Sequence, residues 1–384
     1  LNIPVCEMKI KKDDPSGLFN LFNIESKYQL PDENDEALVL HTSGTTSRPK
    51  IVPLTNKNIY SSAENISKSL NLSEADHCLN IMPLFHIHGL IAILAASIKS
   101  GASVCVSSGF NALKFLDNAK REKITWYSGV PTMHQAILMR ADKNLETAKQ
   151  LNLRFLRSSS ASLPPAVFEK LNEVFNCPVI EAYGMTEATH QMTSNPLPPK
   201  SQKPGFVGIP AGPEVCIMDT NNKILNQGEE GEVCIRGENV TSGYENNPDA
   251  NKNSFSNGWF RTGDQGYFDK DGYLKISGRL KEIINKGGEK ISPLEVDNIL
   301  MDHPNIEQAV CFGYEDKMLG EDIATAIIIK EGMKCTEDDI KIYANEKLAK
   351  FKIPKKIFFV NEIPKGATGK LQRNTLAKKF GLVN

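Results

Sequence analysis

The sequence has 384 residues, enough for two or three domains, and its 40% hydrophobic and 24% charged residues are typical of a globular protein. A formal charge of −1 at pH 7 excludes a general attraction to nucleic acid or to an anionic membrane. No apolar run approaches the ~20 residues of a membrane span, and the eight cysteines contain no CxxC pair, which favours reduced thiols over a disulfide framework or a metal site.

The first informative segment is a loop between two apolar runs. Residues 37–41 predict a buried strand, and residues 51–55 precede a helical pattern. The loop 43–50 between them reads SGTTSRPK. Small hydroxyl side chains, free backbone N–H groups and a final lysine suit a polyphosphate. The loop differs from the Walker loop because a proline precedes the lysine, and such a loop by itself is usually a solvated turn.

Strand-like and helix-like runs then alternate. The predicted strands are 102–106, 124–128, 153–157 and 179–183, and the predicted helices are 111–121, 130–140 and one that starts at 164–165. The most apolar stretch, 81–98, contains two histidines and predicts a buried loop and helix. This alternation favours an α/β fold, with a parallel sheet covered by helices on both faces.

The pattern changes after residue 205. Short alternating strands at 232–236, 266–268 and 273–276 predict an antiparallel β subdomain. A compact α+β segment follows, with helices predicted at 293–301 and 337–348 and strands at 309–313 and 324–330. We expect a large domain over 1–280, a small domain over 281–384 and a hinge at Lys281.

Five further motifs follow the loop in order: YGMTE at 183–187, WFRTGD at 259–264, GRLKE at 278–282, GGEKISP at 287–293 and PKGATGK at 364–370. The first comes directly after a strand, where open α/β sheets bind ligands. The second offers a carboxylate suited to a ribose diol, and the paired glycines let a backbone approach a ligand closely. Each motif alone is weak, but their order and domain-scale spacing are specific.

Together these motifs resemble the adenylate-forming superfamily of acyl- and aryl-CoA synthetases, luciferases and peptide-synthetase adenylation domains. The resemblance covers essentially the whole chain but begins partway into the family's large domain. Because the chain starts at Leu1 without a signal-peptide pattern, we interpret it as a fragment or a processed product. The resemblance implies an AMP-binding large domain with a C-terminal lid domain. It also implies an acid–CoA ligase that uses ATP, Mg²⁺ and CoA.

The resemblance also implies residue roles. The nucleotide would be bound by Thr42, Ser43, Gly44, Thr45, Thr46, Lys50, Glu181, Ala182, Tyr183, Gly184, Met185, Thr186, Asp264, Arg279 and Lys370. Glu187 would hold Mg²⁺, Lys281 would be the hinge, and Gly287 and Gly288 would line the CoA channel. The predicted catalytic residues are Lys370, Thr186 and His86.

Polar residues around the acid site point to a particular branch. Ser47 stands where the family usually has glycine, residues 158–162 are mostly serine, and His190 stands where many relatives have proline. These details look most like the oxalate–CoA ligases. Burying oxalate's second carboxylate in an apolar tunnel would cost several kcal/mol. The predicted donors that would offset this cost are His86, Ser159, Ser160 and His190.

Two other functions stay open: a ligase for a medium-chain or aromatic acid, and an inactive nucleotide-binding remnant. A peptide-synthetase adenylation domain is disfavoured, because Ala188 and His190 offer no anchor for an ammonium group. The expected partners are small molecules only, with no nucleic acid and no membrane span, and the oligomeric state stays open. We expect a cytoplasmic location. The resemblance also allows a peroxisomal one, although the chain does not end in a Ser-Lys-Leu type signal.

Overall fold

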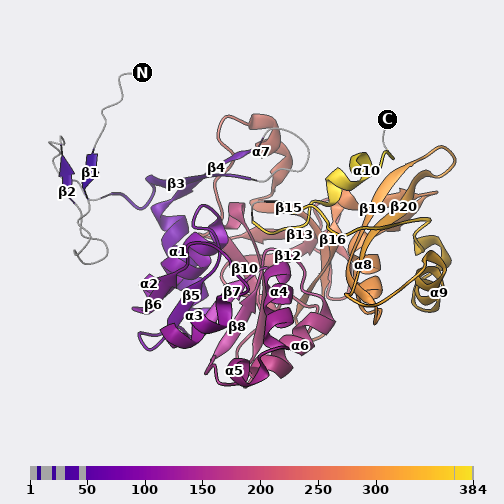
Figure 1. The fold of residues 1–384 in the computed structure, drawn as a ribbon. Coiled ribbons are helices and arrows are strands. Elements are labelled where there is room, and N and C mark those ends of the chain that lie inside the picture. The colour runs from indigo at the N-terminus through magenta and orange to yellow at the C-terminus, as the bar shows by residue number, and fades with distance from the viewer. Residues whose placement is uncertain (1–6, 10–19, 23–30, 43–48, 367, 383–384) are drawn as a thin grey trace.

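The computed structural model describes residues 7–9, 20–22, 31–42, 49–366 and 368–382. A two-stranded sheet of β1 (Glu7–Lys9) and β2 (Asn20–Phe22) lies apart from the rest at the left of Figure 1. The C-terminal segment lies at the opposite side of the same view. The large middle part between them carries most of the predicted site.

The centre is a seven-stranded sheet in the order β11-β10-β9-β8-β7-β5-β6. Its strands are β5 (His77–Asn80), β6 (Ser103–Val106), β7 (Trp126–Gly129), β8 (Phe155–Ser158), β9 (Val179–Met185), β10 (His190–Ser194) and β11 (Ile209–Pro210). Strands β5 to β9 are parallel to one another. Strand β10 pairs antiparallel with β9, and β11 pairs antiparallel with β10. The predicted parallel α/β sheet is confirmed.

Helices form two groups around this sheet. One group contains α1 (Asn56–Ser69), the π-helix η1 (His88–Ala95) and α2 (Ala96–Lys99), and the other contains α3 (Phe115–Glu122), α4 (Pro131–Ala141), α5 (Leu145–Lys149) and α6 (Pro165–Phe175). The chain runs from β5 to β6 in one direction and from β7 to β9 in the other. Because such crossovers are right-handed, η1 and α2 lie on one face and α3–α6 on the other.

The strand predicted at 37–41 exists, but its predicted burial is wrong. It is β3 (Glu36–His41), and among the described residues it pairs only with β4 (Ile51–Thr55). Leu38 and Leu40 pack against the core, whereas Val39 between them is 49% exposed. The β3–β4 hairpin lies at the rim of the large part (Figure 1). An apolar run therefore did not mean that both faces of the strand are covered.

The helix predicted from residue 111 begins later. The Asn111 side chain accepts hydrogen bonds from the backbone N–H groups of Leu113 and Lys114 and forms a turn, and α3 starts only at Phe115. An asparagine side chain that bonds to its own backbone competes with the helix in this way.

An antiparallel five-stranded sheet confirms the β subdomain. Its strands are β12 (Glu214–Met218), β13 (Gly231–Arg236), β14 (Phe255–Ser256), β15 (Trp259–Phe268) and β16 (Leu274–Arg279). Helix α7 (Pro248–Ser254) precedes β14, and the short helix η3 (Leu280–Glu282) follows β16. The register places Asp264 opposite Arg279.

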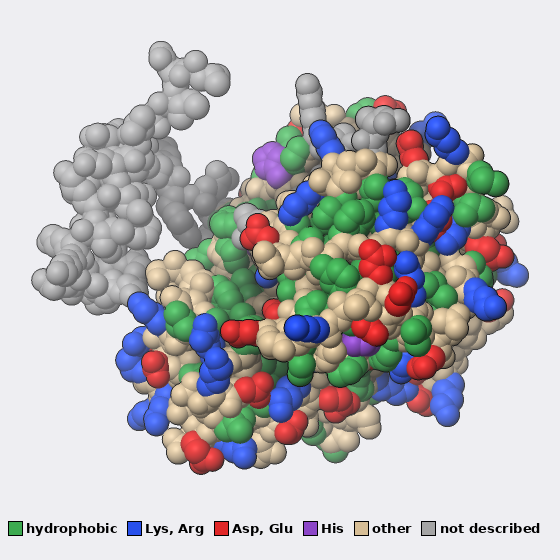
Figure 2. All heavy atoms as spheres, turned by 45° about the vertical axis from the view of Figure 1, so that its right-hand side comes forward, with side chains coloured by type: hydrophobic (Ala, Val, Ile, Leu, Met, Phe, Trp, Pro, Cys, Tyr) green, Lys and Arg blue, Asp and Glu red, His purple; other side chains and the backbone are tan. Residues whose placement is uncertain are grey.

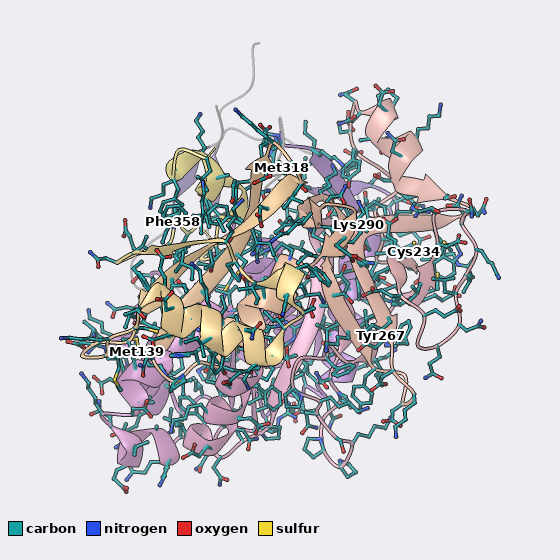
Figure 3. All side chains as sticks on the ribbon, turned by 90° about the vertical axis from the view of Figure 1, so that its right-hand side faces the viewer. Met139, Cys234, Tyr267, Lys290, Met318 and Phe358 are labelled. Atoms are coloured by element: carbon teal, nitrogen blue, oxygen red, sulfur yellow. The ribbon has the colours of Figure 1, made fainter. Side chains whose placement is uncertain are left out.

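The C-terminal α+β segment has its own sheet and two hydrophobic clusters. Its elements are β17 (Ile284–Lys286), β18 (Glu289–Ile291), α8 (Pro293–Met301), β19 (Ile306–Asp316), β20 (Gly320–Ile329), α9 (Glu337–Lys347), β21 (Lys356–Phe359) and α10 (Leu376–Lys379). Phe358, labelled in Figure 3, stacks on Phe380 with ring centroids 4.2 Å apart, which fixes α10 against the sheet. The predicted helices and strands of this segment are confirmed, with β19 and β20 longer than expected.

The surface is of mixed charge. Lys and Arg side chains are interspersed with Asp and Glu on the face drawn in Figure 2, in keeping with the formal charge of −1. None of the helices in the described part combines the length and apolar character needed to cross a membrane.

The fold predicts a stability hotspot at Asp76, which lies just before β5. Its carboxylate accepts bonds from Arg154 Nε at 2.9 Å, Arg154 Nη2 at 3.0 Å, Ser73 N at 2.9 Å and Thr125 Oγ1 at 3.0 Å. Asp76→Ala should cost about 3 kcal/mol, because it leaves several donors without a partner. Thermal unfolding followed by circular dichroism should show the midpoint falling by several degrees. The exposed Glu169→Ala is the control and should melt like the wild type; equal midpoints for both variants would contradict this role.

Candidate active site

The predicted site residues lie at one edge of the central sheet. His86 follows β5, Ser159 and Ser160 follow β8, and residues 183–190 lie at the end of β9 and just beyond it. The carboxyl ends of parallel strands meet at this edge, and the strand order reverses between β5 and β7. Open α/β sheets bind ligands at such a reversal. Residues far apart in the sequence are therefore brought together by topology.

Tyr183, Asp264 and Arg279 form one cluster. The Tyr183 hydroxyl donates to Asp264 at 2.5 Å, and Arg279 Nε donates to the same carboxylate at 2.8 Å. Burial, and next the charge of Asp264, raise the pKa of Tyr183 well above its usual value. Asp264 itself is almost fully buried. The structure thus brings together three residues that sequence analysis assigned to the nucleotide.

Lys50, Glu187 and Tyr244 form a second cluster. The Lys50 ammonium lies 4.1 Å from the centre of the Tyr244 ring, and the Tyr244 hydroxyl donates to Glu187 Oε1 at 2.7 Å. Burial lowers the pKa of Lys50, while the charge of Glu187 opposes that shift. Thr42 pairs with Lys50 through two hydrogen bonds that close the base of the loop. The predicted residues Ser43, Gly44, Thr45 and Thr46 lie outside the described residues.

Tyr244 is a site residue that sequence analysis missed. It lies between β13 and α7, in a segment for which we predicted no motif. Its ring makes a cation–π contact with Lys50, and its hydroxyl donates a hydrogen bond to Glu187. Tyr244 therefore holds the two opposite charges in place. An isolated tyrosine after Gly243 gave no periodic or motif signal.

Lys370 lies where these clusters meet. Burial, and next the charge of Arg279, lower its pKa to about 8, whereas Asp264 and Glu187 raise it. The charge of Lys370 in turn contributes to lowering the pKa of His86. The loop that carries Lys370 is held to the large part by Thr132, whose hydroxyl donates to the Gly369 carbonyl at 2.9 Å. The C-terminal segment therefore places its lysine at the edge of the central sheet.

A buried chain of hydrogen bonds fixes the direction of several side chains. Ser128 donates to the Arg157 carbonyl at 3.2 Å, so the 2.7 Å bond between His88 Nε2 and Ser128 is donated by histidine. Burial lowers the pKa of His88 well below its usual value, so its ring is neutral and its Nδ1 accepts from Ser160 at 3.1 Å. The Ser160 hydrogen is therefore engaged by His88.

Ser159 also uses its hydrogen within the protein. Its hydroxyl is fully buried and donates to the Ala182 carbonyl at 2.8 Å. Neither predicted serine donor is free, whereas His86 keeps one. Its Nδ1 accepts from the His88 backbone N–H at 3.2 Å, and burial lowers its pKa to about 4. The neutral His86 ring thus carries its hydrogen on Nε2.

The remaining predicted nucleotide residues lie along β9. Glu181 is buried, accepts from the Gly205 N–H at 2.8 Å, and has a pKa raised to about 8 by burial. Gly184 could not carry a side chain, because a Cβ there would be 1.8 Å from the His190 carbonyl oxygen. Met185 ends β9, and Thr186 begins the short helix η2 (Thr186–Ala188).

Gly287 and Gly288 are not brought to this cluster. They form the exposed turn between β17 and β18, with φ values of 61° and 95°, and Gly287 donates to the Leu319 carbonyl at 2.8 Å. Lys281 lies exposed in η3, between the two sheets that the hinge would separate. Its charge contributes to lowering the pKa of Lys50.

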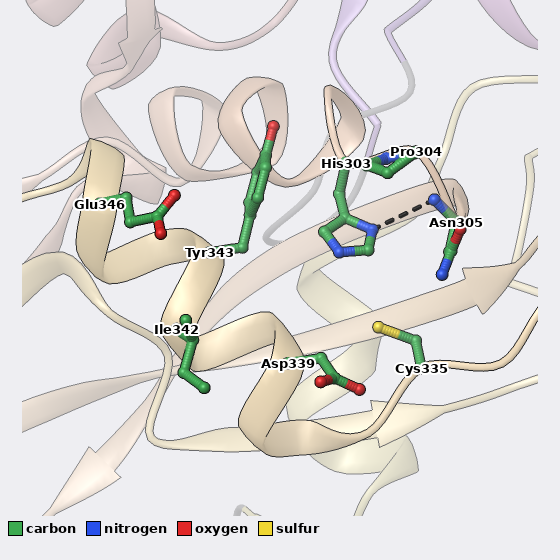
Figure 4. A pocket seen from close by; sticks show the side chains of 8 residues that line it. All are labelled: His303, Pro304, Asn305, Cys335, Asp339, Ile342, Tyr343 and Glu346. Carbon is green, nitrogen blue, oxygen red and sulfur yellow. Dashed lines mark hydrogen bonds between the residues drawn. The ribbon is translucent and has the colours of Figure 1, made fainter.

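A pocket of about 380 Å³ lies elsewhere, on the C-terminal segment. His303 and Tyr343 pack edge to face in its lining, and it contains none of the predicted site residues (Figure 4). It plays no part in the arrangement described above.

The buried histidines predict acid sensitivity. His134 is fully buried, and burial lowers its pKa to about 4 from 6.5. Because the folded pKa is depressed, its stabilising effect is complete above pH 6.5 and is lost as the pH falls towards 4, a loss of about 3 kcal/mol. Urea titrations should show the free energy of unfolding falling between pH 7 and 5, and less steeply in His134→Gln. The exposed His41→Gln should keep the wild-type slope; a flat wild-type profile would refute the prediction.

Comparison with known proteins agrees with this geometry. Residues 6–245 match the family model described as AMP-binding enzyme, and residues 295–370 match the AMP-binding enzyme C-terminal domain. The chain is 52% identical over 350 residues to an oxalate–CoA ligase of Arabidopsis thaliana, covering 90% of this chain and 68% of that protein. It is 50% identical to an oxalate–CoA ligase of Saccharomyces cerevisiae, covering 90% of this chain and 64% of that protein.

Solved structures give the same assignment. ATP-bound MatB from Rhodopseudomonas palustris superposes with a TM-score of 0.85 at 30% identity, covering 91% of this chain and 69% of that one. The o-succinylbenzoate CoA synthetase MenE of Bacillus subtilis, in complex with its acyl-adenylate intermediate, gives a TM-score of 0.80 at 33% identity, covering 90% and 69%. The chain spans about two thirds of the length of these proteins. With both family models matched in order, this chain belongs to the AMP-binding enzymes.

Proposed function

We propose that the chain is an ATP-dependent, AMP-forming acid–CoA ligase and that its acid is oxalate. The observation that carries the proposal is the position of Lys370 among three clusters. One offers Tyr183 and Asp264 to a nucleoside, and another offers Lys50 and Glu187 to phosphates. The third is the hydrogen-bonded group of His86, His88 and Ser160. The oxalate–CoA ligases named above, at about half identity, support the same reading.

The first half-reaction would form the acyl-adenylate. A carboxylate oxygen of the acid attacks the α-phosphorus, and the bond to the bridging oxygen breaks as pyrophosphate leaves. The protein's part is to orient the groups and to stabilise negative charge on the phosphate oxygens. Lys370 and Lys50 would supply positive charge, Thr186 would bond the α-phosphate, and Asp264 would hold the ribose.

Glu187 is a suitable residue for Mg²⁺. One of its carboxylate oxygens accepts from Tyr244, and the charge of Lys50 is nearby. Among the described residues no cluster of three or more His, Cys, Asp or Glu side chains could hold a metal. Mg²⁺ commonly binds through one or two carboxylates together with substrate phosphates, and when bound it would neutralise phosphate charge.

The second half-reaction would transfer the acyl group to CoA. The thiol attacks the acyl carbon, and the bond to AMP breaks. We propose that the small domain, 281–384, rotates about Lys281 relative to the large domain, 1–280. Lys370 would leave the site and the turn at Gly287 and Gly288 would enter it. In the present arrangement Lys370 lies in the site and the Gly287–Gly288 turn is exposed. This fits a small domain that alternates between two positions.

We also infer a reducing compartment such as the cytosol. Seven cysteines are free in the described part of the chain, and five of them are buried. Structural disulfides are rare in reducing compartments, so this pattern supports the location expected from the sequence.

The first test compares acids. Pyrophosphate release by the full-length protein would be measured with ATP, Mg²⁺ and CoA, using oxalate, malonate, acetate, octanoate and coumarate. We expect oxalate to exceed the others, because the buried polar groups favour a small dianion over an apolar tail. Preference for octanoate or coumarate would support the ligase chemistry but contradict the assignment of oxalate as the acid. No release with any acid, while ATP still binds, would point to an inactive remnant.

The second test uses the pKa of Lys370, which is about 8. The ammonium loses its proton above that value, so kcat/KM for ATP in pyrophosphate release should fall as the pH rises through 8. Lys370→Arg should move this fall to higher pH, because the guanidinium stays charged. Lys370→Gln should lower adenylation by roughly 100-fold, a usual cost of removing one charge-stabilising group.

Thiolysis of the preformed acyl-adenylate should hardly change in Lys370→Gln. The matched control is Lys365→Gln, an exposed lysine in the same loop, which should retain the wild-type rate. A wild-type pH profile in Lys370→Arg would contradict the assigned role.

A further inference from the structure

Arg157 is a cation in the interior of the large part. It lies in β8, between β7 and β9, with no exposed surface. Its Nη2 donates to the side-chain oxygen of Gln191 at 3.1 Å. Its Nε and Nη1 have no hydrogen-bond partner anywhere in the described part of the chain. Buried guanidinium groups normally have their donors satisfied, so these two nitrogens point to a partner that is not part of the described protein.

The charge of Arg157 persists at neutral pH. Burial lowers its pKa only to about 9, and its hydrogen-bonding partner Gln191 is a neutral amide. A buried cation paired with a neutral group is costly unless an anion compensates it. Arg154, which directly precedes this strand and is partly exposed, differs because it is paired with the carboxylate of Asp76.

His190, like Arg157, is buried and has polar nitrogens without hydrogen-bond partners in the described chain, in its case both ring nitrogens. Burial, and next the charge of Arg157, lower its pKa well below the usual value, so the ring is neutral and one nitrogen carries a hydrogen. Its ring centroid lies 5.0 Å from that of His88. Arg157 and His190 are therefore neighbouring groups with unused donors.

Two of the four predicted acid-site donors, Ser159 and Ser160, have no hydrogen left for a ligand. Ser159 donates to the Ala182 carbonyl, and Ser160 donates to His88. His86 can donate from Nε2, because its Nδ1 accepts from the His88 backbone. Of the predicted donors, His86 and His190 therefore keep a hydrogen for an anion, and Arg157 adds two unpaired nitrogens beside them.

Backbone conformation marks the same place. Ser160 has φ 73° and His190 has φ 97°, values that side-chain-bearing residues rarely adopt. The His190 carbonyl lies so close to Gly184 that a side chain there would clash with it. Such strain persists where surrounding structure enforces it, and it clusters at ligand sites.

We propose that Arg157, together with His190, binds the second carboxylate of the acid substrate and makes the enzyme selective for a dianion. The inference rests on the proposed acid–CoA ligase function. The carboxylate that reacts would lie at the α-phosphate near Lys370, whose charge contributes to lowering the pKa of His86 and of His190. The other carboxylate of a two-carbon diacid then faces the unused donors. An acid without it would leave Arg157 uncompensated, which is the basis of selectivity.

The test compares Arg157→Met, which keeps length and removes charge, with Arg157→Lys, which keeps charge and removes the planar fork. Acid-dependent pyrophosphate release by the full-length protein would be measured with oxalate, malonate, acetate and glyoxylate. Arg157→Met should lower kcat/KM for oxalate by at least about 100-fold, while KM for ATP stays within about twofold. Activity with acetate and glyoxylate should be retained or increased, so the oxalate-to-acetate ratio reverses. Arg157→Lys should recover part of the oxalate activity.

Arg154→Met is the matched control, because it removes an arginine three residues away whose partner is Asp76. It should lower the thermal midpoint but keep the oxalate-to-acetate ratio. Thermal unfolding of each Arg157 variant separates loss of folding from loss of selectivity, and if Arg157→Met does not fold, the ratio in Arg157→Lys decides. If kcat/KM falls by the same factor for oxalate and for acetate in a folded Arg157 variant, so that the oxalate-to-acetate ratio is unchanged, the inference is overturned.

The wild-type measurements separate this inference from the proposed function. If the wild type uses oxalate and Arg157→Met keeps that preference, the function stands and the role of Arg157 fails. If the wild type prefers malonate over acetate and Arg157→Met removes that preference, oxalate is wrong and the role of Arg157 stands. If the wild type uses only monocarboxylic acids, or none, both fail.

Discussion

The site depends on the reversal of strand order in the central sheet. Because β5 leads to β6 on one side and β7–β9 extend on the other, the loops at the carboxyl ends of β5, β7, β8 and β9 lie around the point of reversal. His86, Thr132, Ser160 and Tyr183 follow or end these four strands. Thr132 then receives the loop of Lys370 through Gly369, so the same reversal also positions the C-terminal segment.

At this edge of the sheet the carboxylates have partners within the protein, whereas several cations are held at a cost. Asp264 and Glu187 both have partners, Arg279 and Tyr183 for the first and Tyr244 for the second. Burial lowers the pKa of three cations, Lys50, Lys370 and Arg157. A site that retains partly or fully buried cations at this cost is suited to anionic ligands such as a triphosphate and a dicarboxylic acid.

The π-helix η1 supports the polar wall of the site. It begins at His88, whose two ring nitrogens connect Ser160 of the β8 loop with Ser128 of β7. Its next residue must be glycine, because a Cβ at Gly89 would be 2.4 Å from the Pro83 carbonyl oxygen. This packing fixes the turn that carries His86 against the start of the helix. Single stretches of π-helix are frequent at functional sites, where they redirect side chains.

The sequence by itself determined the alternation of elements, the antiparallel subdomain, the C-terminal segment and the order of the motifs, because these depend on local periodicity and on short runs of residues. Tertiary structure decided the burial of β3, since an apolar run does not say whether a neighbour covers its second face. It also decided the roles of Tyr244 and Arg157 and the engagement of Ser159 and Ser160, because hydrogen-bond direction depends on partners distant in the chain. Arg157, the second of two arginines in the predicted strand 153–157, was a signal that sequence analysis passed over. Only its unsatisfied nitrogens in the folded chain gave that signal a chemical meaning.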